Sequence, residues 1–185
     1  MDLSLPQTYL IGLSALLVII AILAGRQVLR VRRDEMELIR LEKVGNNTSA
    51  DSAKLYELAS VELRKRLYPQ AISTLKKSLK ALDSEPSEAK AIIENALGYA
   101  LAAQDNFKEA INHYEKAIKA KSNYPVALNN LAFAKQKLMK EDEAFELYQL
   151  VLGIDPGNKT AKRQIKKMEK IKGSNSSNIV YKKGF

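Results

Sequence analysis

The chain has no cysteine, which excludes disulfide bonds, thiolate metal sites and cysteine nucleophiles. Its single histidine, His113, cannot form a histidine cluster, and we interpret it as a surface or packing residue. The sequence also lacks a phosphate-binding loop, a metal-ligand cluster and a nucleophile with a base at a useful spacing. It therefore predicts a protein that is not an enzyme and that has no cofactor, no metal and no small-molecule substrate.

Positive charge is absent ahead of a long apolar run near the start of the chain. From Tyr9 to Ala24 no residue is charged, and ten of the sixteen are Leu, Ile or Val. Together they contribute roughly −3 to −6 kcal/mol to insertion into a bilayer. A cleaved signal peptide is the rival interpretation, but it requires positive charge before the apolar run. The pattern favours a permanent transmembrane anchor over residues 1–26.

Four arginines follow the apolar run and indicate how the anchor is oriented. By the positive-inside rule, everything after the anchor lies on the cytoplasmic or stromal side, and the N-terminus lies on the outer or lumenal side. Residues 27–49 form a basic neck that we expect to stay helical to Val44, with a short coiled coil as the alternative, and then to end in a linker. The membrane-flanking arginines are Arg26, Arg30, Arg32 and Arg33.

One spacing of small and large apolar residues is repeated between Ala91 and Pro156. Each residue of the second copy lies 34 positions after its counterpart: Gly98 with Ala132, Ala110 with Ala144, and Tyr114 with Tyr148. Small residues let two helices cross closely, and a tyrosine one turn further on fills the space between them. The period and pattern resemble the tetratricopeptide repeat (TPR).

A third, weaker copy precedes these two, because Ala59 and Ala71 are twelve residues apart, as are Gly98 and Ala110. The resemblance implies a three-repeat TPR superhelix over residues 50–158 with a C-terminal capping helix, and together with the transmembrane helix this predicts an all-α protein. We expect repeats at about 52–85, 91–124 and 125–158, a basic capping helix at 159–172 and a flexible tail at 173–185. Within the repeats we expect helices starting at Ser52 and Pro69 and others at about 85–103, 107–120, 125–139 and 141–152.

TPR arrays bind peptides or protein segments on the concave surface formed by the first helix of each repeat. The resemblance places eleven residues at inward positions in this sequence. Asparagine amides there would hold a peptide backbone and aromatic rings would add apolar contact, although packing between repeats is the alternative role. A receptor for chaperone carboxylates is disfavoured, because Tyr56, Ile92 and Val126 stand where polar groups are needed. The full set is Tyr56, Ser60, Leu63, Ile92, Asn95, Tyr99, Ala102, Val126, Asn129, Phe133 and Gln136.

The net charge of +9 is concentrated at the anchor and near the C-terminus. Residues 159–172 carry seven basic residues and one acidic residue, Glu169, a net charge of +6. We expect Ala161, Ile165, Met168 and Ile171 to face the array and the lysines to face water. Proximity to an anionic membrane explains the excess, and we expect no nucleic acid partner because no basic patch with interleaved aromatics occurs in the array.

The anchor with its Leu5-Pro6 start, the arginine-rich neck and the overall size resemble the small membrane-anchored TPR proteins of cyanobacteria and algal plastids that assist photosystem I assembly. This resemblance implies a non-catalytic assembly factor in the thylakoid membrane, with photosystem I subunits as partners. Two alternatives stay open: a scaffold of the cell envelope for secretion or division, and an adaptor that tethers RNA.

Overall fold

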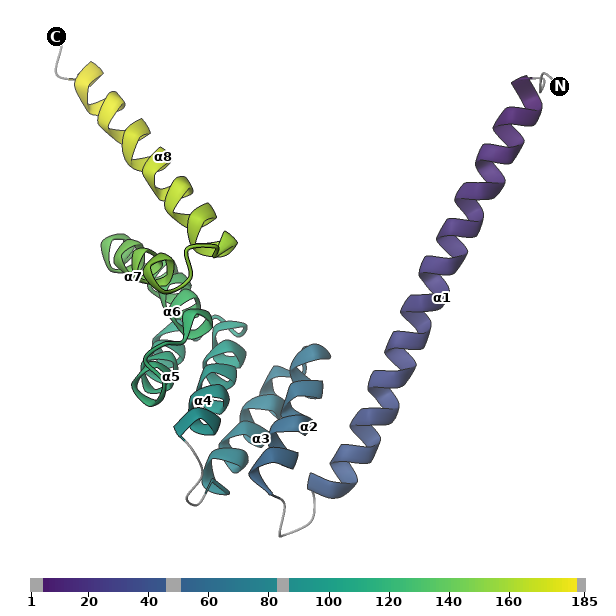
Figure 1. Ribbon diagram of the computed structural model, residues 1–185, viewed down its shortest axis with the longest axis horizontal. Helices are drawn as coiled ribbons and strands as arrows, with labels where there is room; N and C mark the ends of the chain where they lie inside the picture. Colours follow the sequence, from purple (N-terminus) through teal and green to yellow (C-terminus); the bar gives the residue numbers. More distant parts are fainter. Residues whose placement is uncertain (1–4, 46–50, 83–86, 183–185) are drawn as a thin grey trace.

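The computed structural model describes residues 5–45, 51–82 and 87–182, and over these residues the regular structure is entirely helical. Figure 1 shows a V-shaped molecule in which the helical array lies between two outer helices that rise on the same side. The helices are α1 Leu5–Gly45, α2 Ser52–Arg64, α3 Tyr68–Lys80, α4 Ser87–Ala102, α5 Phe107–Ala120, α6 Pro125–Lys137, α7 Glu141–Ile154 and α8 Lys159–Lys182. The predicted all-α fold class is confirmed.

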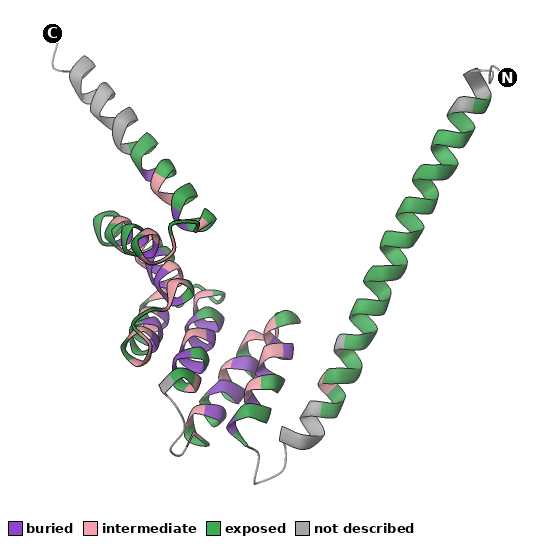
Figure 2. Cartoon of the chain, viewed as in Figure 1, coloured by how far each residue is buried: buried purple, intermediate pink, exposed green. Residues whose placement is uncertain are grey.

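Helices α2 to α7 form three stacked pairs. Each helix contacts the next one along the chain, so the second helix of one pair packs against the first helix of the following pair. Buried residues run through the interior of this stack (Figure 2). They form two clusters, one centred on Leu75, Leu97 and Tyr114 and the other on Tyr148 and Met168. The second cluster includes α8, which closes the end of the stack as a capping helix.

Gly98 explains why the repeat needs a small residue at this position. A Cβ atom there would lie 2.7 Å from the Cε1 atom of Tyr114 and 3.1 Å from the backbone oxygen of Ala110. Tyr114 and Ala110 belong to α5, so the two helices of this repeat approach as closely as the sequence pattern indicates. At the equivalent positions, Ala59 and Ala132 are completely buried.

The turn inside each helix pair contains a left-handed residue that the sequence did not reveal. Arg66, Asp105 and Met139 have φ angles of 61°, 60° and 61°. The next amide donates a hydrogen bond back across the helix end in all three turns, as from Asn106 N to the oxygen of Leu101 at 3.0 Å. This is the Schellman helix ending, here formed without glycine.

Most predicted helix boundaries hold within two residues. Asp51 caps α2 as expected, since its carboxylate accepts a hydrogen bond from the amide of Ala53 at 3.4 Å. Helix α5 spans the predicted range, α6 is two residues shorter and α7 two residues longer. The predicted linker at residues 46–49 and the start of the predicted helix at 85–86 lie outside the described residues.

The predicted end of the capping helix at residue 172 is wrong, because α8 continues to Lys182. No proline follows Pro156, and a single Gly173 costs only about 1 kcal/mol relative to alanine within a helix. The inward face was also predicted one residue too long. Ala161 and Met168 are buried, whereas Ile171 is 49% exposed.

Helix α1 joins the anchor and the neck into one continuous helix, as the pattern to Val44 predicted. Within the described residues it is the one helix long and apolar enough to span a membrane, over Tyr9–Arg40. The array leaves its apolar residues exposed (Figure 2). Two ion pairs join the neck to the end of α2: Glu37 with Arg64 at 2.9 Å and Glu35 with Lys65 at 3.7 Å.

Candidate protein-binding groove

The first helices of the three pairs, α2, α4 and α6, form the inner side of the array. Helix α4 contacts α6 directly as well as the intervening α5. Figure 1 shows α5 and α7 on the outer side of this curve. The predicted inward residues all belong to these three inner helices, so they share one surface.

Large apolar residues are exposed along this inner surface. Tyr99 is 48% exposed, Phe133 42% and Val126 54%, although the adjacent positions Leu97, Ala100 and Ala132 are almost completely buried. An apolar side chain that stays in water at this level contributes little to the fold of the isolated chain. A row of them on neighbouring helices is typical of a protein-interaction surface.

A small apolar cavity lies at the α2 end of the inner surface. It has a volume of about 150 Å³ and lies between α2 and α4. Two predicted groove residues, Tyr56 and Ile92, line it together with Ser52, Ala53, Ala89 and Ile93. A cavity of this size and composition accommodates one aliphatic or aromatic side chain.

Phe133 marks the other end of the surface. Its ring meets the ring of Phe107 edge to face, with centroids 6.3 Å apart. The ammonium group of Lys137 lies 5.4 Å from the Phe133 centroid, which adds a cation–π contact. Gln136, the last predicted groove residue, donates a long 3.5 Å hydrogen bond to Glu141 at the start of α7.

The two repeat-equivalent asparagines are engaged within the array. The side-chain oxygen of Asn95 accepts a hydrogen bond from Asn130 at 2.9 Å, and Asn95 also interacts with the side chain of Tyr124. Asn129 donates to Asn158 at 3.2 Å. Tyr124 and Asn158 are themselves 34 residues apart, and each immediately precedes the first helix of the next unit. These contacts favour the alternative role in packing between repeats for both asparagines.

A buried polar pair joins α4 to α5. His113 Nδ1 lies 2.6 Å from a carboxylate oxygen of Glu94, and both side chains are buried. Of the two roles expected for His113, at the surface or in packing, the structure shows packing, and its partner Glu94 was missed. The sequence did carry a signal for this pair. Leu128 and Leu147 stand 34 residues after Glu94 and His113, and leucine at both equivalent positions indicates that the two sites lie in the interior.

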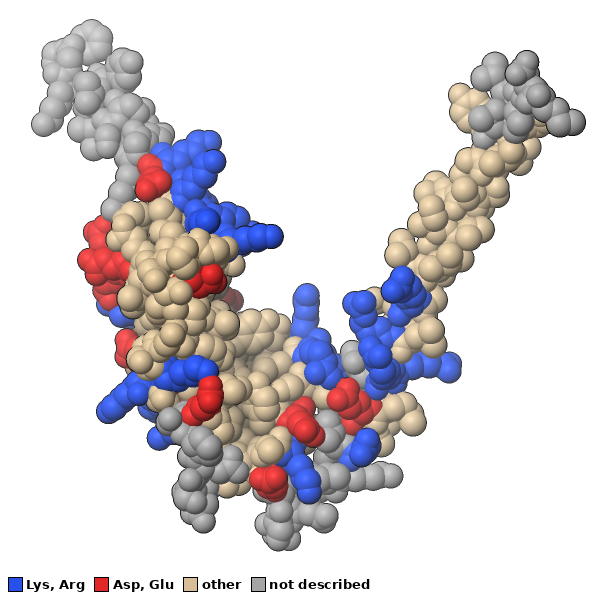
Figure 3. Space-filling model, in the orientation of Figure 1, with Lys and Arg blue, Asp and Glu red and all other residues tan. Residues whose placement is uncertain are grey.

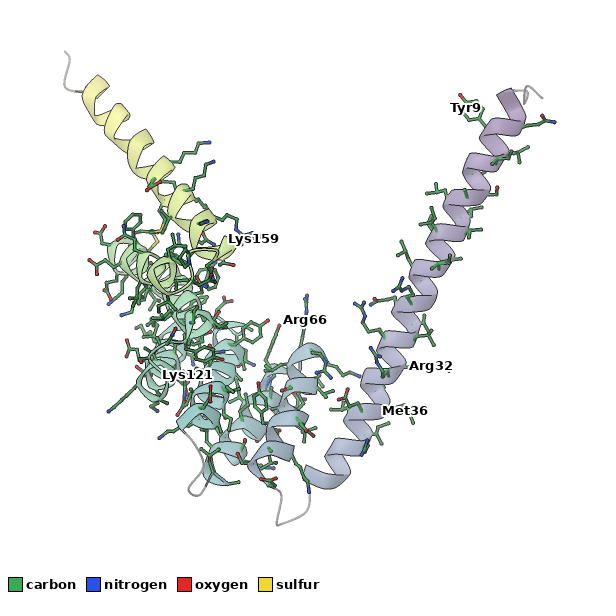
Figure 4. All side chains as sticks on the ribbon, viewed as in Figure 1. Tyr9, Arg32, Met36, Arg66, Lys121 and Lys159 are labelled. Atoms are coloured by element: carbon green, nitrogen blue, oxygen red, sulfur yellow. The ribbon has the colours of Figure 1, made fainter. Side chains whose placement is uncertain are left out.

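Arg26, Arg30, Arg32 and Arg33 are all exposed on α1. Figure 4 shows Arg32 on the part of α1 that leads from Met36 toward Tyr9, beside the array. They lie between the apolar part of the helix and Glu35 and Glu37, which contact α2. This order places the arginines where a membrane surface would meet the neck.

Three stacked helix pairs with a 34-residue period and an exposed inner surface define a TPR protein. Two tetratricopeptide-repeat family models match the chain, at residues 51–123 and 95–159. The chain belongs to the TPR family of plastids and cyanobacteria that includes the ycf37 proteins. The ycf37 protein of Guillardia theta is 30% identical over 161 residues, which cover 87% of this chain and 90% of the relative.

A second relative is longer. The chloroplastic TPR domain-containing protein PYG7 of Arabidopsis thaliana is 31% identical over 161 residues, or 87% of this chain and 53% of PYG7. Among solved structures, the first TPR domain of Spaghetti (RPAP3), bound to an HSP90 peptide, superposes with a TM-score of 0.61. The two sequences are 22% identical, and the superposition covers 68% of this chain and 95% of the RPAP3 domain, so the likeness supports the fold alone.

Proposed function

We propose that the protein is a membrane-anchored assembly factor that holds a segment of an unassembled photosystem I subunit in its groove. The observation that carries this proposal is the row of exposed apolar residues on α4 and α6, which has no covering element among the described residues. The TPR fold is a protein-interaction scaffold, and plastid-type relatives support the photosynthetic setting.

Helix α1 supports the membrane part of the proposal. Its apolar residues are exposed all around the helix, which is favourable in lipid and costly in water. Anchoring in the thylakoid, with the array on the cytoplasmic or stromal side, raises the effective concentration of groove and membrane subunit for one another. Each groove contact can then be weak and reversible, as release to the finished complex requires. An alkaline carbonate wash of native membranes tests the anchor, which should keep the chain in the pellet.

The groove favours a segment with an apolar anchor residue. The cavity beside Tyr56 and Ile92 would receive one such side chain, and Tyr99 and Phe133 would contact the following residues. Because these rings are already exposed on rigid helices, binding them costs little side-chain entropy.

The test is a pull-down on a C-terminal tag from gently solubilised native membranes. In the variant Tyr99→Ala with Phe133→Ala, we expect unchanged helicity and much weaker recovery of photosystem I core subunits or their precursors. Leu150→Ala is the matched control, because Leu150 is 52% exposed on the outer helix α7. Equal recovery with the double variant would contradict groove binding. Recovery of translocase or division components with the wild type would refute the photosystem assignment and leave an envelope adaptor.

A further inference from the structure

Helix α8 carries an uninterrupted basic face. At about 100° per residue, six basic residues project from one side of this helix, opposite the buried Ala161 and Met168. All six are exposed, and none forms an ion pair with another described side chain. They are Lys159, Lys162, Arg163, Lys166, Lys167 and Lys170.

The basic face of α8 is oriented toward the side of the array from which α1 extends. Figure 1 shows that α8 and α1 rise on the same side of the array and diverge from one another. In Figure 3 the basic residues gather on the side of α8 that is turned toward α1. Since α8 slants away from α1, this side also faces the level of the apolar part of the anchor, where a bilayer would lie.

We propose that the basic face of α8 docks on the anionic surface of the membrane that α1 spans, which gives the array a second membrane contact. This inference rests on the membrane anchoring in the proposed function. Lysines at a surface with anionic lipids are attracted over about one Debye length and need no specific partner geometry. Ile171, exposed at the edge of this face, would add apolar contact with the headgroup region.

Docking at two points would fix the tilt of the array. With α1 alone, the array is held to the membrane at one point, through the neck and its two ion pairs with α2. With α8 also held, the inner helices would face the membrane side, toward subunits that are still embedded in the bilayer. The groove would therefore be presented to segments that emerge from the lipid.

The absence of cysteine makes the test direct, because an introduced cysteine is the only labelling site. The full chain carrying Ile171→Cys is labelled with an environment-sensitive fluorophore and placed in nanodiscs of phosphatidylcholine, with or without phosphatidylglycerol. We expect the label to enter a less polar environment only with the anionic lipid, and to leave it as salt is raised. A label at Met139→Cys, which is 82% exposed in the turn between α6 and α7, should not respond.

Charge variants distinguish docking by the basic face of α8 from a general attraction of the positively charged chain to anionic lipid. Neutralising Lys162, Lys166 and Lys170 with glutamine should lower the docking equilibrium roughly 100-fold, at about fivefold per lysine. The matched variant neutralises three exposed lysines of α5, Lys108, Lys116 and Lys119, and should dock as the wild type does. Equal docking of both variants would overturn the proposal.

Two further outcomes would also overturn the proposal. One is a label at residue 171 that responds equally in neutral and anionic nanodiscs. The other is a label that responds only when a protein partner is added, because the basic face would then bind an acidic protein segment. If the chain resists carbonate extraction but shows either result, anchoring stands and only lipid docking by α8 fails.

Discussion

Replacing Gly98 with alanine should destabilise the array, although alanine is the better helix former. In an unobstructed helix this substitution is favourable by about 1 kcal/mol. At Gly98, however, the new methyl carbon would lie 2.7 Å from a ring carbon of Tyr114, where about 3.5–4.0 Å is normal. The ring cannot swing away, because Tyr114 is only 2% exposed in the core.

The magnitude follows from these two opposing effects. Overpacking a close-packed interior costs about 1–3 kcal/mol, and a contact this short on a rigid ring belongs in the upper half of that range. Subtracting the helix-propensity gain leaves a net loss of about 1 to 2 kcal/mol. Gly153→Ala is the control, because nothing lies within 4 Å of a Cβ at this exposed position of α7, and it should stabilise by up to about 1 kcal/mol.

The assay is urea unfolding of the full chain in detergent, followed by circular dichroism. The first repeat suggests the rescue, since Leu75 stands there in place of Tyr114, opposite Ala59. In a double-mutant cycle, Tyr114→Leu should therefore recover most of the loss caused by Gly98→Ala. The steric argument would be refuted if Gly98→Ala proved as stabilising as Gly153→Ala, or if the two substitutions were additive.

Three further substitutions test other parts of the structure. Met139→Gly should stabilise by about 0.5–1 kcal/mol in the same urea assay, because glycine adopts a φ of 61° without strain; a loss of stability would contradict this. His113→Leu alone should lower the free energy of unfolding by about 3 kcal/mol, because the buried Glu94 loses this partner. The double variant Glu94→Leu with His113→Leu should recover most of this loss, because leucines occupy both equivalent sites in the third repeat, at Leu128 and Leu147. Burial raises the pKa of Tyr148 from 10.0 to about 12. The neutral hydroxyl of Tyr148 therefore adds stability that is complete below pH 10 and is lost as the pH rises toward 12. Tyr148→Phe should flatten the alkaline unfolding curve between these pH values, and an unchanged curve would show that Tyr148 does not contribute.

The repeat period was sufficient to predict the array from the sequence, because spacing is a direct consequence of helix packing. Gly98 and Tyr114 must meet if two helices cross closely, and the same requirement 34 residues later fixes a second pair. The TPR resemblance placed Tyr99 and Phe133 at equivalent inward positions, and both side chains are exposed.

The features that were missed depend on contacts without a repeated pattern. The left-handed turns use Arg66, Asp105 and Met139, three unrelated residue types, so composition did not mark them. The Glu94–His113 pair occurs in one repeat only. The end of α8 was misplaced because Gly173 and the polar residues after it read as a linker, while no proline is present to stop the helix.

The structural contacts of Asn95 and Asn129 affect how variants of the groove should be interpreted. Asn129 donates to Asn158, whose side chain also accepts a hydrogen bond from the amide of Ala161 and so caps α8. Asn129→Ala should therefore loosen the capping helix, and Asn95→Ala should loosen the contact with Tyr124, at about 1 kcal/mol each.

Loss of partner capture by the asparagine double variant would then reflect a weaker array. Capture lost in Tyr99→Ala with Phe133→Ala at unchanged stability would reflect the groove itself. The two causes are separated by measuring urea midpoint and pull-down recovery on the same preparations. If Asn95→Ala with Asn129→Ala left the midpoint unchanged and abolished capture, these amides would bind the partner directly, and the packing role assigned to them would be wrong.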